Sequence, residues 1–362
     1  MYWSEGADKK SGNYHITEYE REFVSQLKQR KPDDCILVNS TWWSDPEKVE
    51  RMKQWFNASQ FKAGECPRIL VYSGMDWEST NCVDSCKEAH AFLKDRFEVI
   101  HIGNSREEKW GGWNQKSMKK RGRHYFSFWL SFIHKHLDTF YDSCYTEMPN
   151  IQKHYMTLNH QPHEHRISFL NDLYTMGLFK DTIVSAIKPH EDYIFENPII
   201  LKENRPPHIM DKSFEWERLS DTHLANDIIS LGEPQYWNKH FCTVVTESVM
   251  HSDVFISEKT FKPLIGLRPF IIIGDRHLYA KLKEWKFDTF EDLFPNIHRD
   301  EPDKYRRIDN ALKDMFEFQF NHGLDELNNL YGTLEDRLMY NRKRVLEVIN
   351  ENYNDIMEIN KL

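Results

Sequence analysis

The sequence predicts an α/β protein with two Rossmann-like domains and a helical carboxyl-terminal tail. The chain has 362 residues, more than one hydrophobic core usually serves, so two domains of roughly 150 residues are expected. In each half, short apolar runs typical of strands alternate with amphipathic runs typical of helices, as in parallel sheets covered by helices. We therefore place one domain at residues 1–150, a second at 151–330 and a terminal helix at 331–362.

The first half contains three expected strands, at residues 34–38, 68–73 and 97–102, each followed by polar residues. In a parallel sheet, functional groups belong at the carboxyl ends of the strands. Asp76 and Glu78 follow the second strand, and a carboxylate partly removed from water at such a position suits a general base. A simple turn is the alternative, because glycine and aspartate are turn formers.

Residues 106–124 carry seven Lys or Arg side chains against two Glu, although the whole chain has a net charge of −9. The negative total argues against a general nucleic-acid coat protein. Basic residues interleaved with tryptophan and flexible glycine suit a polyanion, either a nucleic-acid backbone with stacked bases or a phosphorylated glycan. A solvated basic loop fits the same composition. The candidate acceptor contacts in this stretch are Trp110, Trp113, Lys119, Lys120, Arg121 and Arg123.

The second half repeats the alternation of strand and helix. A helix that carries Arg166 is expected after the first strand, and a second helix begins near Ser257 and is closed by Gly266. The chain after Gly274 is mainly helical in pattern. The expected strands lie at residues 153–158, 182–185, 241–246 and 269–274.

The segment from Glu247 to Lys259 carries the strongest functional signal. Glu247 ends a buried strand, and Ser257-Glu258-Lys259 opens the helix that follows the loop. A helix that begins at the carboxyl end of a parallel strand presents free N–H groups and a positive dipole end, which suit a phosphate. Lys259 adds a charge for that phosphate, and Glu258 offers two acceptors for the hydroxyls of a ribose or sugar. An ordinary βαβ unit remains the alternative.

This segment resembles the donor-site signature of the α-1,3-fucosyltransferase family, in which an acidic strand end, FEN, precedes a Tyr-x-Thr-Glu-Lys turn, a helix and a strand that ends in glycine. Here Thr246-Glu247-Ser248 corresponds to FEN, and the run from Phe255 to Lys259 corresponds to the turn. The Glu-Lys pair and Gly274 match. Ser248 replaces the Asn and Phe255 replaces the Tyr, so two polar contacts to the donor are absent or replaced. The resemblance covers roughly the last 200 residues at the level of motifs.

The resemblance implies a GT-B arrangement, with the acceptor on the first domain and a nucleotide sugar on the second. It implies that Lys259 and Arg166 bind the diphosphate, Glu258 the ribose, and that Glu247 binds the sugar or orients Lys259. Tyr72-Ser73-Gly74-Met75-Asp76 is similar to the family's run with its expected base, but Met75 stands where the Glu would be. Asp76 is then the expected base, with Glu78 as the alternative. The expected donor-binding set is Arg166, Glu247, Ser248, Phe255, Ser257, Glu258 and Lys259.

The function expected from this resemblance is glycosyl transfer from a nucleoside-diphosphate sugar to an acceptor hydroxyl, with inversion and with no metal or other cofactor. The chain lacks the GxGxxG and GxxxxGK[ST] motifs and an Asp-x-Asp triplet at a strand end, which argues against dehydrogenase, kinase-type and metal-dependent glycosyltransferase classes. A glycan is the expected acceptor. A hydroxylated base in DNA is the alternative, since the chain also resembles bacteriophage-encoded transferases. A non-catalytic nucleotide-binding module is the third possibility, which the Met75 departure permits.

Six cysteines lie at irregular spacings, and Cys82, Cys86 and His90 do not complete a tetrahedral metal site. No charged-then-apolar leader opens the chain. The apolar run at 125–137 is too short to cross a bilayer and is expected to be a buried helix. We therefore expect a cytoplasmic protein, in the host cytoplasm if a phage encodes it. The oligomeric state stays open.

Overall fold

The computed structural model describes residues 149–159, 161–186, 190–195, 231, 234–250 and 254–359, with side chains as far as residue 351. In the first half it describes the backbone of four strands and isolated helical positions between residues 49 and 92. The chain divides into two compact units, one of residues 1–128, 252–254 and 350–362, and the other of residues 129–251 and 255–349.

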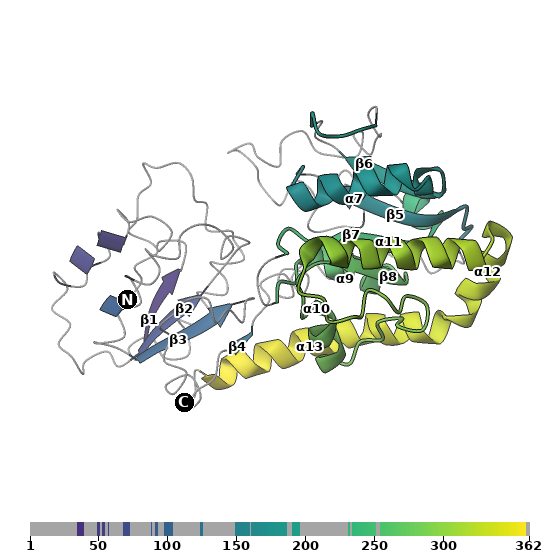
Figure 1. The fold of residues 1–362 in the computed structure, drawn as a ribbon. Coiled ribbons are helices and arrows are strands. Elements are labelled where there is room, and N and C mark those ends of the chain that lie inside the picture. The colour runs from purple at the N-terminus through teal and green to yellow at the C-terminus, as the bar shows by residue number, and fades with distance from the viewer. Residues whose placement is uncertain are drawn as a thin grey trace. The chain divides into compact units, whose positions relative to one another are not determined.

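Each unit contains one four-stranded parallel sheet, and the described helices lie mainly in the second unit (Figure 1). The predicted mixed α/β class with parallel sheets is therefore confirmed. That both units are Rossmann-like domains, with boundaries at residues 150 and 330, stays a prediction.

The sheet of the first unit has the strand order β1-β2-β3-β4. Three of these strands lie where the apolar runs predicted them. The strand β4 was not predicted, because two residues leave no periodicity to read, and Tyr125 lies in it instead of beginning a helix. The bounds are Cys35–Asn39 for β1, Arg68–Tyr72 for β2, Glu98–Gly103 for β3 and His124–Tyr125 for β4.

The sheet of the second unit has the strand order β6-β5-β7-β8, and every pair in it is parallel. From β5 the chain passes through α7 and the short 3₁₀ helix η3 to β6 on one side, and then continues to β7 on the other side of β5. The bounds are Lys153–Asn159 for β5, Thr182–Ala186 for β6, His240–Thr246 for β7, Phe270–Ile273 for β8, Glu164–Thr175 for α7 and Leu178–Asp181 for η3. The winding direction therefore reverses between β5 and β7, and ligands bind outside the carboxyl ends of strands at such a switch point.

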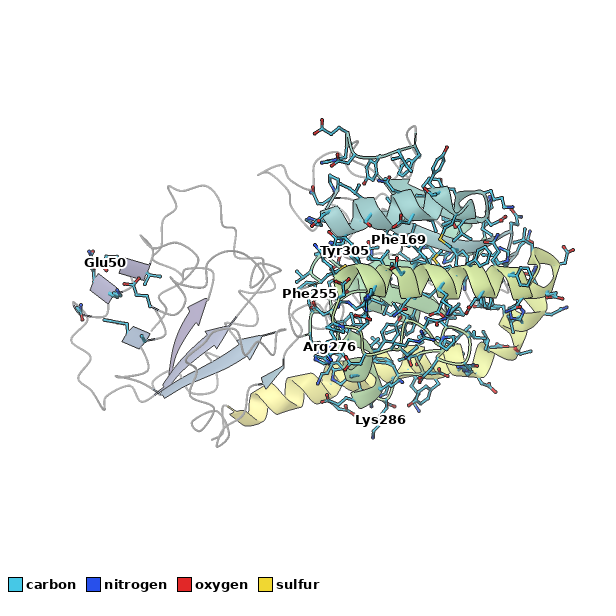
Figure 2. The ribbon with its side chains drawn as sticks, in the orientation of Figure 1. Glu50, Phe169, Phe255, Arg276, Lys286 and Tyr305 are labelled. Carbon is cyan, nitrogen blue, oxygen red and sulfur yellow. The ribbon has the colours of Figure 1, made fainter. Side chains whose placement is uncertain are left out.

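Helices cover both faces of this sheet. The crossovers β5-α7-β6 and β7-α9-β8 run in opposite directions, so right-handed connections place α7 (Glu164–Thr175) and α9 (Glu258–Ile265) on opposite faces. The long helix α11 (Lys304–Asn321) packs beside α7, as Figure 1 shows. Tyr305 at the start of α11, labelled in Figure 2, donates a hydrogen bond to Glu164 at the start of α7. The amino ends of α7 and α11 therefore meet near the switch point.

The core of the second unit buries two neighbouring strands over their whole length. All seven residues of β7 and all four of β8 are buried. Phe318 of α11 stacks on Phe241 of β7, with ring centroids 5.1 Å apart, and fully burying one such side chain contributes about 1.5–3 kcal/mol. The remaining described helices are α8 (Pro234–Trp237), α10 (Leu278–Glu284), α12 (Leu324–Thr333) and α13 (Glu335–Ile359). Within the described part of the chain, no helix combines the length and apolar character that a membrane span requires.

Candidate functional site

Buried polar side chains close the carboxyl ends of the two strands that flank the switch point. Thr246, the last residue of β7, donates from Oγ1 to Oδ1 of Asn159, the last residue of β5, over 2.6 Å. Asn159 Nδ2 donates in turn to Thr157 Oγ1 over 3.2 Å. These bonds satisfy polar groups that would otherwise be costly to bury, and they fix the two strand ends relative to each other.

The carboxylate of Glu247 ties the end of β7 to the start of α9. Its Oε1 accepts hydrogen bonds from Ser257 N (2.9 Å) and Thr260 Oγ1 (2.6 Å), and its Oε2 accepts one from Ser257 Oγ (2.5 Å). Glu247, Ser257 and Thr260 have no exposed surface. Both carboxylate oxygens are therefore used inside the protein, which makes Glu247 an anchor for the helix start.

The first turn of α9 carries Lys259 beside Glu258. Ser257 is the N-cap, and its Oγ accepts hydrogen bonds from Lys259 N (3.3 Å) and Lys259 Nζ (3.2 Å). Lys259 Nζ also donates to Glu258 Oε1 over 2.8 Å. The Lys259 side chain is 29% exposed, whereas that of Glu258 is 8% exposed. The ammonium group is therefore held in one place at a helix amino end and remains accessible to a ligand.

The second carboxylate oxygen of Glu258, Oε2, is buried and has no hydrogen-bond partner in the described structure. Burial alone would raise the pKa of Glu258, but the charge and hydrogen bond of Lys259, with smaller contributions that include the charge of Lys262, outweigh burial and lower the pKa below its ordinary value. The carboxylate is thus ionised with one acceptor unused. A buried acceptor left unpaired costs about 1–3 kcal/mol, and a ligand hydroxyl would remove that cost.

Two side chains from the start of α7 hold the main chain at the end of β7. Arg166 donates from Nη2 to Thr246 O (2.9 Å) and from Nη1 to Gln161 O (3.3 Å). His165 Nε2 lies 2.8 Å from Glu247 O, and because a carbonyl only accepts, this nitrogen carries the proton. The starts of α7 and α9 therefore converge on Thr246 and Glu247.

Positive charge concentrates at this convergence. Burial, reinforced by the charge of Arg166, lowers the pKa of His165 to about 3. Burial, followed by the charges of Arg166 and then Lys259, also lowers the pKa of His163. The rings of His163 and His165 lie nearly parallel, with centroids 5.8 Å apart. Both imidazoles are therefore neutral at pH 7, and Arg166 and Lys259 supply the positive charge of the site.

The structure brings together five residues of the expected donor set, namely Arg166, Glu247, Ser257, Glu258 and Lys259. Ser248 is half-buried in the bend after β7. Phe255, labelled in Figure 2, is 3% exposed and belongs to the core. The other expected site residues lie outside the described residues, namely Asp76, Glu78, Trp110, Trp113, Lys119, Lys120, Arg121 and Arg123.

Two residues of this site, Thr260 and His165, were not predicted from the sequence. Thr260 could have been found, because it lies three positions after the N-cap and so shares the first turn of the helix. No local signal marks the role of His165, since its partner, Glu247 O, lies 82 positions away in the chain. Among the described residues, no group of three or more His, Cys, Asp or Glu could hold a metal ion.

No family model matches this chain, and no curated protein matches it. One similar solved structure is a crystal structure of an alpha1,3-fucosyltransferase, at 11% sequence identity and a TM-score of 0.32. The match covers 88% of this chain and 91% of that chain. A TM-score of this size does not establish a shared fold.

Proposed function

We propose that this chain is a glycosyltransferase that moves a sugar from a nucleoside-diphosphate sugar to an acceptor hydroxyl. The observation that carries the proposal is the arrangement of Lys259 and Glu258 in the first turn of α9, at the switch point of a parallel sheet. This arrangement places the ammonium group of Lys259, which can bind a phosphate, beside the ionised carboxylate of Glu258. The Oε2 atom of that carboxylate has no hydrogen-bond partner in the described structure. The sequence resemblance to the fucosyltransferase donor site supports the same reading.

Lys259 and the amino end of α9 bind the diphosphate in this proposal. The helix dipole and the ammonium group stabilise the negative charge that develops on the leaving diphosphate, so the reaction proceeds without a metal ion. Arg166 adds positive potential, and its hydrogen bonds to Thr246 O and Gln161 O also keep the strand end in place. Its contact to phosphate stays a prediction, because the guanidinium already serves these carbonyls.

Glu258 binds the ribose of the donor. The unpaired Oε2 accepts a hydrogen bond from a ribose hydroxyl, while Oε1 stays with Lys259. Glu247 orients Lys259 through the Ser257 hydroxyl, which is the second of the two roles expected for it. Direct contact of Glu247 with the sugar is not needed, since both of its oxygens are used.

Asp76 acts as the base, with Glu78 as the alternative, in a single displacement with inversion. The acceptor oxygen gives its proton to the carboxylate and forms a bond to the anomeric carbon. The bond from that carbon to the diphosphate oxygen breaks, and the diphosphate leaves with the electron pair. These two residues come from the sequence argument alone.

The proposed acceptor is a glycan. A hydroxylated base in DNA is the second candidate, because the basic and aromatic composition of residues 106–124 suits a polyanion. A gel shift with duplex DNA that weakens with salt, and that is lost when Lys119, Lys120, Arg121 and Arg123 are neutralised together, would favour DNA. Hydrolysis of intact nucleotide sugar would exclude a non-catalytic binding module.

A thermal-shift screen with UDP, GDP, CMP and dTDP tests the donor site. One of the diphosphates should stabilise the wild type by about 2.7 kcal/mol at a hundredfold excess over Kd. Lys259→Ala should abolish this effect, and Lys283→Ala, which changes an exposed lysine of α10, should retain it. If no nucleotide stabilises the wild type, the proposed function is wrong.

A further inference from the structure

Arg307 joins three segments of main chain at the carboxyl edge of the second sheet, meaning the end of the sheet at which its parallel strands finish. The residue lies in the first turn of α11 and is 6% exposed. Its Nε donates to Gly274 O (3.0 Å) and its Nη2 to Met250 O (2.6 Å). Its Nη1 donates to Glu301 O and Pro302 O, both over 2.9 Å. One guanidinium therefore connects the loops after β7 and β8 to the segment before α11.

The acceptors of Arg307 identify what this buried charge does. All four are main-chain carbonyls, so the hydrogen bonds fix backbone positions and do not form an ion pair. Burial lowers the pKa of Arg307, and the charge of Asp275 acts in the opposite direction. Burying a cation costs free energy unless the cation is hydrogen-bonded. The planar guanidinium can donate to carbonyls that lie in different directions, which the single nitrogen of a lysine ammonium group cannot do equally well.

The segments that Arg307 holds lead directly to the candidate site. Met250 lies in the loop that begins at Glu247. Gly274 packs against Glu247, because a Cβ atom added to Gly274 would lie 3.4 Å from Glu247 Cγ. Glu247 in turn fixes Ser257, whose hydroxyl accepts from Lys259 Nζ. The order of Glu247, and with it the place of Lys259, therefore depends on two loops that Arg307 keeps together.

We propose that Arg307 is a positioning residue for the phosphate-binding lysine. It holds the loops after β7 and β8 in the geometry in which Glu247 and Ser257 orient Lys259. The inference rests on the proposed function, because it names a residue that supports the same donor site. It assigns to Arg307 no contact with the substrate.

Arg268 provides a matched control for a purely structural role. It is also a buried arginine, and it donates to the carbonyls of Trp237 (3.0 Å) and Leu267 (2.7 Å). It precedes β8, whereas Arg307 contacts the residue that follows β8. The two arginines therefore both fix main chain around one sheet. Arg307 holds the loops that reach the start of α9, where Lys259 lies, whereas Arg268 contacts the other end of α9, at Gly266 O (3.3 Å).

The test compares wild type, Arg307→Lys and Arg268→Lys by calorimetric titration with UDP, GDP, dTDP and inorganic pyrophosphate. We expect Arg307→Lys to raise Kd at least tenfold and to speed amide hydrogen exchange in residues 247–250 and 255–260. Arg268→Lys should lower the unfolding midpoint and leave Kd within twofold of wild type. An unchanged Kd in Arg307→Lys, with wild-type binding intact, overturns this inference alone. Absence of binding to wild type overturns the proposed function itself.

A second measurement covers the case in which Arg307→Lys does not fold. Hydrogen exchange of the wild type is then compared with and without the diphosphate that binds it. Protection should extend from the start of α9 to residues 274–277, whose main chain Arg307 holds through Gly274 O. Protection confined to residues 255–260 would count against the proposed role.

Discussion

The second sheet buries polar groups in different ways at its amino edge, where the parallel strands begin, and at its carboxyl edge, where they finish. At the amino edge, His240 uses both ring nitrogens inside the protein, with Tyr236 O at 2.8 Å and Thr243 Oγ1 at 2.9 Å. Arg268 at the same edge also contacts the hydroxyl of Tyr331 at 2.8 Å. At the carboxyl edge, Lys259 is partly exposed and one oxygen of Glu258 has no partner in the described structure. The charged and imidazole groups of Arg268 and His240 are hydrogen-bonded inside the protein, whereas at the carboxyl edge the ionised carboxylate of Glu258 keeps one oxygen for a ligand.

This difference shows that polarity alone does not mark a binding site. An unpaired buried atom does not suffice either, since His154 Nδ1 also lacks a partner among the described residues. The imidazole of His154 is kept neutral because burial lowers its pKa, whereas Lys259 keeps Glu258 ionised. An unpaired atom on a charged group is the more costly of the two, so it is the stronger indication of a missing ligand.

The largest expected effect comes from removing the anchor of the carboxyl edge. Glu247→Ala leaves the donors of Ser257 and Thr260 buried without their acceptor, which should lower the free energy of unfolding by about 3–5 kcal/mol. The variant should also lose nucleotide binding, because the start of α9 is no longer fixed. Urea denaturation and the nucleotide thermal shift measure the two effects.

Thr243→Val is the matched change at the amino edge. It removes the hydrogen bond to His240 and should cost about 1 kcal/mol while nucleotide binding persists. A Glu247→Ala protein that binds nucleotide like the wild type would show that the anchor does not organise the site.

The two glycines that flank β8 sharpen the comparison. A Cβ atom at Gly266, before the strand, would lie 2.7 Å and 2.8 Å from ring carbons of Trp237, whose ring is fully buried. A Cβ atom at Gly274, after the strand, would lie 2.8 Å from the flexible end of Leu278 and 3.4 Å from Glu247 Cγ. Gly266→Ala should therefore destabilise by about 3 kcal/mol, and Gly274→Ala by about 1 kcal/mol.

Their effects on binding should have the opposite order. Gly274→Ala displaces Glu247 and should weaken nucleotide binding, whereas Gly266→Ala disturbs a packing contact away from the carboxyl edge and should leave Kd unchanged. Parallel measurements of the unfolding midpoint and of Kd check this. If both variants lose stability and affinity in proportion, the two edges do not differ as described.

Much of the second unit could be predicted from the sequence because its signals are local. The apolar runs predicted β5 to β8 to within one or two residues, and Ser257 and Gly266 marked the ends of α9. The pairing of Lys259 with Glu258 follows from their adjacency at a helix start.

The parts that could not be predicted depend on contacts between distant residues. Arg307 reaches Met250 across 57 positions, and His165 reaches Glu247 across 82. No period or motif records such contacts, since they arise only when α7 and α11 pack beside the sheet. For the same reason the sequence could not show that the oxygens of Glu247 meet Ser257 and Thr260, which lie 10 and 13 positions further along the chain.

The last comparison concerns a property in which the two edges should agree. His165 at the carboxyl edge and His240 at the amino edge are both buried, and burial lowers the pKa of each. In the unfolded chain the histidine has a pKa of about 6.5 and binds a proton below that pH. In the folded chain the buried histidine binds the proton only when the pH approaches its lowered pKa. Stability should therefore fall as the pH drops below about 6.5, and for His165 the fall continues to about pH 3.

For His165 the loss should reach about 2 kcal/mol at pH 5, since each pH unit below the unfolded pKa contributes about 1.4 kcal/mol. His165→Gln keeps an N–H group that can donate to Glu247 O but cannot be protonated, so it should flatten the dependence by that amount. His240→Gln should flatten it in the same direction. Urea denaturation between pH 5 and pH 8 measures the slopes, and a His165→Gln curve parallel to that of the wild type would show that His165 is protonated as easily in the folded chain as in the unfolded one.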